Sequence, residues 1–432
     1  MTNPDPERPD QANLQKPALW AALAHRDFAF LWAGGISMSI TGVLRTLVSG
    51  QWLYDSTGSP ALLGMLGAVQ LLQLPVGLYG GTLSDRINRK KLMVMTQGVA
   101  FTMLFFLTML AASDTLKPWH IFAVTGVSGI VNNLGSSARP AMLPRVVPRE
   151  LLTHAVTTQI ATRQISVIIA PIIFWQVFER LGVTTAFAIA ASLALISMIM
   201  PMLIKASGQP EGTGRHTTIK LLREGYDFVM GHRLLPGLYL LDIGVVIVSF
   251  YRQLFPVFAD QLYGLGAAGT GMLNTADAIG GIIGTYIVLR ANSYKKKGFL
   301  VLVATLIYAV LLFGFGINRV FFIGLVFIAG LGIMDAISQA MRQTIVQLTT
   351  PDRLLGRASS AHSFAASGAN HLGQIEVGIM SGIIGAGNTL ILGGAISLLV
   401  VFGVWYLIPS IRKYSYDPEH PYETEEDNRN RI

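Results

Sequence analysis

Apolar segments, each about as long as a membrane-crossing helix, recur along almost the whole chain and limit what it can fold into. A helix needs roughly 20 predominantly apolar residues to cross the hydrocarbon core of a bilayer. Twelve such segments can be placed, at 28–54, 61–83, 92–112, 119–142, 154–178, 184–204, 235–259, 267–289, 299–316, 320–341, 358–384 and 389–408. Only 13% of the residues are charged, about half the share typical of a soluble domain. The sequence therefore predicts an all-α membrane protein with twelve transmembrane helices.

The basic residues of the connecting loops alternate strictly along the chain. Five alternate loops carry three to five Lys or Arg each, and the last of them is expected to include Arg342. The opposite loops contain only Lys117, Arg180 and Arg319. Because Lys and Arg near span ends accumulate on the cytoplasmic side, both termini are predicted to be cytoplasmic. The distribution of basic residues over alternate loops thus accounts for the net charge of +8, and no nucleic-acid partner is expected.

Corresponding spans of the two halves share a pattern of small and polar residues. The second span has Gly67, Gln70, Gln73, Gly77 and Gly80, and the eighth has Gly271, Asn274, Asp277, Gly281 and Gly284. The offset is constant, and the spacing places each set on one helix face. Glycine stripes are also close-packing surfaces in any membrane bundle, but that does not explain the constant offset. Two pseudo-symmetric six-helix bundles are therefore predicted.

The polar stretches around the spans predict five regions. An N-terminal tail at 1–26 precedes the first bundle at 27–204, and a linker at 205–233 leads to the second bundle at 234–411. A second tail at 412–432 follows. Both tails and the linker are expected on the cytoplasmic side.

A motif in the loop after the second span carries a family resemblance. The chain there reads Gly81-Thr-Leu-Ser-Asp-Arg-Ile-Asn-Arg-Lys-Lys91, which resembles the signature loop of the major facilitator superfamily of transporters. The strings Trp52 to Ser59, Ser137 to Pro148 and Leu355 to Ala358 are similar to one branch, the enterobactin exporters and macrolide efflux proteins. The fifth span departs from that branch, because it has Ala170-Pro171 where relatives carry Gly-Pro and then paired glycines. The resemblance implies the major facilitator fold.

The resemblance also implies a gate at the cytoplasmic ends of the helices. In the family the signature Asp, here Asp85, fixes helices of opposite halves to each other and holds the outward-facing state. A carboxylate there can sit at a helix N-terminus or pair with Arg139 or Arg145. The same charges also suit a solvated loop on the cytoplasmic side. The expected gating residues are Gly81, Leu83, Asp85, Arg86, Arg89, Lys90, Arg139 and Arg145.

Polar side chains inside the spans are the candidates for a transport site, since a charge within the hydrocarbon is costly. Arg163 and Asp277 lie about ten residues into the fifth and eighth spans, at 1.5 Å rise per residue close to the midplane. These spans are neighbours in the family fold, so an ion pair between the halves is one expectation, and separate hydrogen bonds within each half are the other. The substrate and proton candidates are Arg45, Asn132, Asn133, Arg163, Asp242, Arg252, Asn274, Asp277 and Asp335.

Two of the carboxylates and three of the arginines have more specific expected roles. Asp335 is the first candidate for a proton-coupling carboxylate and Asp277 the second, although a purely structural role would explain either one. Arg45 and Arg252 lie toward the outer ends of their spans and, with Arg163, would suit an anionic or catecholate-like cargo. Snorkelling of the terminal arginines to the membrane interface is the alternative.

The expected function is secondary active export of a small siderophore-like or drug-like amphipathic molecule, by alternating access and proton antiport across a bacterial inner membrane. Proton-symport uptake of a nutrient and a non-transporting ligand sensor are the alternatives. The chain has no cysteine, no Gly-x-x-x-x-Gly-Lys-Ser/Thr loop and no nucleophile cluster in its spans. Neither an enzyme nor a bound cofactor or metal is therefore expected. The expected partners of this monomer are its substrate, protons and the lipid bilayer.

Overall fold

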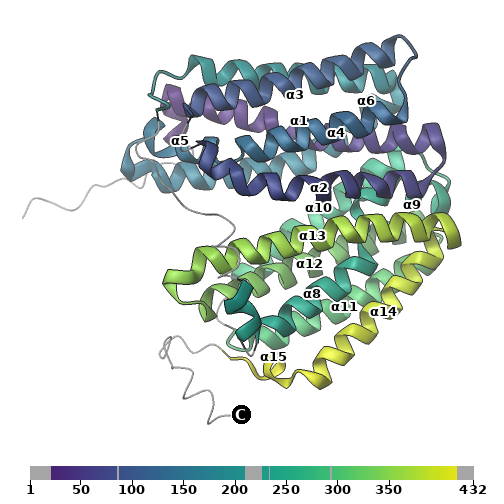
Figure 1. The fold of residues 1–432 in the computed structure, drawn as a ribbon. Helices are drawn as coiled ribbons and strands as arrows, with labels where there is room; N and C mark the ends of the chain where they lie inside the picture. The colour runs from purple at the N-terminus through teal and green to yellow at the C-terminus, as the bar shows by residue number, and fades with distance from the viewer. Residues whose placement is uncertain (1–20, 85–86, 210–225, 233, 292–293, 416–432) are drawn as a thin grey trace, which may run out of the picture.

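The structure is a computed structural model that describes residues 21–84, 87–209, 226–232, 234–291 and 294–415, and every regular element within these ranges is a helix (Figure 1). The long helices are α1 (Arg26–Thr57), α2 (Pro60–Ser84), α3 (Arg89–Ala112), α4 (Pro118–Gly135), α6 (Leu152–Ile199), α8 (Leu235–Ser249), α10 (Ala267–Arg290), α11 (Lys297–Ile317), α12 (Phe321–Thr349), α13 (Asp352–Ile384) and α14 (Ala386–Leu407). The short ones are α5 (Ala138–Val146), α9 (Phe255–Tyr263), α15 (Pro409–Lys413) and the 3-10 turns η1 (Ala21–Ala24), η2 (Arg149–Leu151), η3 (Met200–Leu203) and η4 (Arg252–Leu254).

The helices account for all twelve predicted spans. Among the described residues, nine helical stretches are long and apolar enough to cross a membrane. One of them, 149–203, contains two spans, because α6 turns at Gly182 (φ 80°, ψ 175°), a backbone conformation that glycine adopts readily. Another, 235–263, joins α8, η4 and α9 into one span. Together with the more polar helices α4 and α13, these complete the twelve and confirm the predicted fold class.

Each half of the chain packs mainly against itself. In the first half α1 and α3 pack along α6, and α2 packs along α4. In the second half α10 packs along α12, and α11 packs along both α12 and α14. Figure 1 shows the two groups, the first from purple to blue-teal above and the second from teal through green to yellow below. The exact domain boundaries stay predictions, since residues 210–225 of the linker and the ends of both tails lie outside the described part of the chain.

The internal repeat has a direct counterpart in the packing. In the first half, Gln73 of α2 lies over Gly129 of α4, so closely that a side chain at Gly129 would overlap the Gln73 amide. In the second half, Asp277 of α10 lies over Gly332 of α12, where a Cβ would overlap the Asp277 carbonyl oxygen and lie 3.1 Å from its Oδ1. The glycine provides the space that its polar neighbour occupies. The same pairing of helices is therefore built twice.

Within the described residues, the contacts between the two halves are concentrated at one end of the molecule. There, a single apolar cluster contains residues of both halves, such as Leu44 and Phe187 from the first and Phe258 and Leu331 from the second. Toward the other end, each half has an apolar cluster of its own. Figure 1 shows α2 and α13 close together near α9 and diverging toward α5. The end where the halves diverge carries the predicted cytoplasmic loops.

Glycines and side-chain hydrogen bonds join the halves at the closed end. Gly64 of α2 faces Gly378 of α13, and a Cβ at Gly64 would lie 2.8 Å from both the Gln374 carbonyl oxygen and the Gly378 Cα. Beside them, the Tyr54 hydroxyl donates to an Asp260 carboxylate oxygen at 2.9 Å. The Thr270 hydroxyl donates to the Gln51 amide oxygen at 2.7 Å. The contact is thus a close backbone approach supported by polar bonds between α1 and the second half.

Replacing Gly64 by Ala should weaken this contact. The added methyl group meets backbone atoms of α13, which cannot rotate away, so we expect a lower thermal midpoint in detergent. Gly403→Ala is the matched control, since a Cβ at Gly403 has no neighbour within 4 Å and Ala favours a helix by about 0.5–1 kcal/mol. Equal thermal midpoints for the two variants would show that the approach of α2 to α13 does not stabilise the protein.

Candidate transport site

A cavity of about 260 Å³ lies between the two halves, next to the closed end. Its walls combine apolar side chains with amides, hydroxyls and two arginines. The amide of Gln253 donates to that of Gln70 across the two halves at 3.4 Å. The lining residues are Gly42, Val43, Arg45, Thr46, Leu47, Ser49, Gly50, Leu63, Leu66, Gln70, Thr125, Arg252, Gln253, Pro256, Asn274 and Gln374. Sites for small molecules are concave, mostly apolar and fitted with a few polar groups, as this cavity is.

A break in the seventh span places one of these arginines. The sequence predicts an uninterrupted helix over 235–259, but α8 ends at Ser249 and α9 begins at Phe255. Pro256 has no N–H, and its ring clashes with the carbonyl four residues earlier, which prevents the helix from continuing through Arg252. The Tyr308 hydroxyl donates to the freed Ser249 carbonyl oxygen at 3.2 Å. Irregular backbone at membrane depth is tolerated where protein groups satisfy it in this way.

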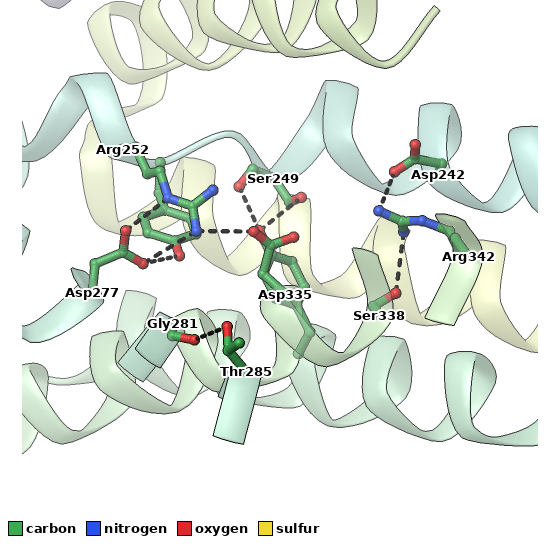
Figure 2. A network of polar contacts seen from close by, with 11 residues as sticks. Asp242, Ser249, Arg252, Asp277, Gly281, Thr285, Asp335, Ser338 and Arg342 are labelled. Atoms are coloured by element: carbon green, nitrogen blue, oxygen red, sulfur yellow. Dashed lines mark hydrogen bonds and ion pairs between the residues drawn. The ribbon is translucent and has the colours of Figure 1, made fainter. Parts of the chain in front are cut away.

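The guanidinium of Arg252 binds two carboxylates from two other helices (Figure 2). Its Nε lies 2.7 Å from Oδ2 of Asp277 on α10, and its Nη2 lies 2.9 Å from Oδ2 of Asp335 on α12. The Tyr251 hydroxyl donates to Oδ1 of Asp277 at 2.6 Å. The side chain of Asp335 is 29% exposed and that of Asp277 only 14%. One cation thus holds two carboxylates, of which Asp335 has fewer partners and more contact with the surroundings.

A second ion pair lies deeper in the same bundle. Arg342 Nη2 of α12 is 2.9 Å from Oδ1 of Asp242 on α8, and both side chains are at most 9% exposed. Arg342 also donates to the Ser338 hydroxyl at 3.1 Å. Figure 2 shows this pair beside the Arg252 cluster but separate from it. The expectation that Arg342 belongs to a cytoplasmic loop is wrong, because α12 continues to Thr349 and carries Arg342 within it.

Arg45 differs from these arginines because no carboxylate of the described residues pairs with it. It lines the cavity from α1 and is half-buried. Among the described residues, no hydrogen bond or ion pair joins its guanidinium to another side chain or carbonyl. The cavity therefore contains one arginine that is paired and one that is not.

The expected ion pair between Arg163 and Asp277 is wrong. The helices that carry them, α6 and α10, do pack against each other as expected. However, Asp277 faces inward to Tyr251 and Arg252, while Arg163 is exposed on α6 and lines neither cavity. The spacing of residues along each helix gives their depth, but the rotation of the helix decides which of them face each other.

The two asparagines of α4 lie elsewhere in the first bundle. Asn132 lines a second cavity of about 190 Å³ among α1, α3, α4, α5 and α6, where Arg139 and Gln159 also lie. Asn133 donates to the Gln73 carbonyl oxygen at 3.4 Å. Asn274, in contrast, lines the cavity between the halves and donates to the Thr270 carbonyl oxygen at 2.9 Å. Of the nine candidates, the structure thus brings Arg45, Arg252, Asn274, Asp277 and Asp335 to one region.

The residues expected to form the gate are only partly described. Asp85 and Arg86 lie outside the described residues, and the side chain of Leu83 and the surroundings of Gly81 are not described either. The other four bind backbone carbonyl oxygens: Arg89 binds Ala141, Lys90 binds Ile204, Arg139 binds Leu31, and Arg145 binds Ser207 and Gln209. These contacts tie the ends of α1, α3 and α5 and the start of the linker together. The gating role itself stays a prediction.

Sequence reasoning missed several members of the site. Tyr251 and Tyr308 support the Arg252 cluster, and Arg342 is the partner of Asp242. The signal in the sequence was that Tyr251 stands directly before Arg252 and that Pro256 follows four residues later, which indicates a break in the helix at this arginine. The partner of Asp242 had to be a cation on a neighbouring helix. Arg342 can be that partner because α12 extends to Thr349 and so contains it.

Comparison with known proteins identifies the family. The model of the Major Facilitator Superfamily matches residues 30–374. The chain belongs to this superfamily. It is therefore a multi-pass membrane transporter, and its cavity between two six-helix bundles lies in a fold built for transport.

Two relatives in the superfamily are enterobactin exporters. The enterobactin exporter EntS of Shigella boydii serotype 4 is 26% identical over 344 residues, which cover 79% of this chain and 80% of the relative. EntS of Escherichia coli O1:K1 is 29% identical over 286 residues, covering 65% and 68%. Solved structures share the fold: a mutant of the nucleoside transporter NupG aligns with a TM-score of 0.74 at 10% identity, covering 88% of this chain and 99% of that one. The D-xylose-proton symporter aligns with a TM-score of 0.61 at 14% identity, covering 90% and 98%.

Breaking the buried ion pair should destabilise the second bundle. Arg342→Gln leaves the Asp242 carboxylate buried without a cation, which typically costs about 3–5 kcal/mol, so we expect a clearly lower thermal midpoint in detergent. The double variant Asp242→Asn with Arg342→Gln should recover much of the loss, because neither charge then remains. Arg290→Gln, at an exposed arginine of α10, is the control. No recovery in the double variant would mean that the two residues do not act as a pair.

Proposed function

We propose that this protein is a secondary active exporter of a small amphipathic molecule, siderophore-like or drug-like, driven by proton antiport. The observation that carries the proposal is the Arg252 cluster at the wall of the cavity between the halves. Alternating access requires a binding site that one rocking motion exposes to either side. The cavity is flanked by two halves whose described contacts are concentrated at one end, which supports that motion.

Proton coupling is proposed for Asp335. Two carboxylates share one guanidinium, so the cluster carries a net negative charge when both are ionised. A proton on Asp335 would leave the stronger set of contacts, between Arg252, Tyr251 and Asp277, in place. Loss of this proton would restore the ion pair between Arg252 of η4 and Asp335 of α12. Protonation of Asp335 would thus weaken, and deprotonation strengthen, the contact between the seventh and tenth spans. An interaction that switches between two states in this way can couple proton binding to a conformational change.

The direction of transport and the class of cargo rest on the relatives. The two named relatives are enterobactin exporters, and over most of their length this chain aligns with them. We place the protein in a bacterial inner membrane with both termini in the cytoplasm, as the loop charges predict. In that orientation the open end faces the cytoplasm, where an exported molecule would bind.

The coupling is tested by flux in proteoliposomes. A pH gradient imposed across the membrane should drive enterobactin, or a macrolide as the alternative cargo, against its concentration gradient. Asp335→Asn should abolish the response to the pH gradient, because an amide cannot bind and release a proton at physiological pH, while downhill flux continues.

The matched control for this experiment is Asp114→Asn. Asp114 lies in an exposed turn after α3 with φ 51°, which Asn also tolerates. We expect it to behave like the unsubstituted protein. Gradient-driven flux that survives in Asp335→Asn would remove this carboxylate from the coupling mechanism, and cargo movement toward the cytoplasmic face under the gradient would support uptake instead of export.

The orientation can be tested with single cysteines, because the chain contains none of its own. Thr115 follows α3 and Ser207 follows η3, and both are exposed. We expect a membrane-impermeant maleimide to label Thr115→Cys in intact cells and Ser207→Cys only after the cells are permeabilised. The opposite pattern of labelling would invert the proposed topology.

A further inference from the structure

The lining of the central cavity carries positive charges but no negative ones. Of its sixteen lining residues, two are arginines, none is acidic and the rest are neutral. The carboxylates of Asp277 and Asp335 bind Arg252 but do not belong to the lining. The wall that a ligand would touch therefore presents cationic and neutral groups only.

Arg45 is the unusual group in this wall. It lies twelve residues before the end of α1, about 18 Å from that end along the helix axis. Arg45 lines the cavity between the halves, whereas a snorkelling side chain extends to the membrane interface. Within the described chain it has no anionic partner, unlike Arg252 and Arg342. A half-buried cation without a partner is costly unless something else supplies the negative charge.

The remaining wall suits the rest of an amphipathic ligand. Val43, Leu47, Leu63 and Leu66 offer apolar contact on the side of the first half. The amides of Gln70, Gln253, Asn274 and Gln374 can donate and accept hydrogen bonds from both halves. A ligand with one anionic group beside an apolar body would match both parts of the wall.

We infer that the cargo carries a negative charge, and that Arg45 is the residue that binds it. This inference rests on the proposed function, because it names the chemical class of the molecule that the cavity takes. Arg45 would bind the anion through a charge-assisted hydrogen bond, and its fork of donors fits a carboxylate or a deprotonated phenol pair. Arg252 would stay with its two carboxylates as part of the coupling machinery.

The charge of the cargo has a consequence for energetics. The interior of a bacterial cell is electrically negative, so an anion leaving it moves down the electrical gradient. For each unit of charge, 100 mV favours exit by roughly 50-fold. A proton that enters in exchange moves in the same electrical sense, so exchange of the two would respond to the membrane potential as well as to the pH gradient.

The inference is tested by binding of two probes of nearly the same shape, one anionic and one neutral. Naphthoate is a small aromatic anion, and naphthamide is its neutral analogue of nearly the same shape. Binding of each to the purified full-length protein in detergent, at neutral pH, gives the preference for the charge. We expect naphthoate to bind about tenfold more tightly or better, and Arg45→Gln to remove that preference, whereas Arg45→Lys retains part of it. Arg180→Gln, at an exposed arginine of the same half, is the matched control and should keep the full preference.

Each outcome has a defined meaning. Equal binding of the two probes, a preference that persists in Arg45→Gln, or failure of naphthoate to bind at millimolar concentration would overturn the inference. Flux of both probes in proteoliposomes without a preference for charge would overturn the inference while export stands. Charge-selective binding at Arg45 without flux of any anionic cargo would support the anion site and overturn the proposed function.

Discussion

The ion pairing of Arg252 is the interaction on which the second half of the molecule depends. A charge at membrane depth is costly unless an opposite charge lies near it, and here one guanidinium binds two carboxylates, on α10 and α12. Those contacts are possible only because the seventh span breaks before Pro256 and lets Arg252 leave the regular helix. The break in the seventh span therefore places Arg252 both in the cavity wall and in the ion-pair cluster.

The way the halves meet complements this arrangement. The contacts between them are concentrated at one end, where glycines of α2 and α13 allow close backbone approach and hydrogen bonds of Tyr54 and Gln51 reach the second half. Toward the other end each half encloses its own apolar cluster, so separation there exposes no shared core. Two bundles, each with an apolar cluster of its own and joined near one end, suit a rocking motion between two packed states.

The first half contributes to the cavity an arginine that is not paired with a carboxylate of the described residues. Where the second half neutralises its arginines internally, α1 presents Arg45 to the cavity without a carboxylate among the described residues. The two halves, although related by an internal repeat, have therefore diverged in electrostatics. Gln73 and Asp277 occupy equivalent positions over equivalent glycines, and only the second is charged. The carboxylates that bind Arg252 therefore belong to the second half, and the unpaired arginine of the cavity belongs to the first.

The sequence by itself determined the helices, their relation as two halves, and which charged residues the membrane would have to accommodate. Those properties follow from local composition and spacing, which Gly67 to Gly80 and Gly271 to Gly284 illustrate. Only the tertiary structure decided which charges meet. Asp277 binds Arg252 and not Arg163, and Arg342 lies inside a bundle and not in a loop, because both outcomes depend on the rotation of each helix and on the true ends of α8 and α12. Depth along a helix is encoded by residue number, whereas the direction of a side chain is set by the packing of its neighbours.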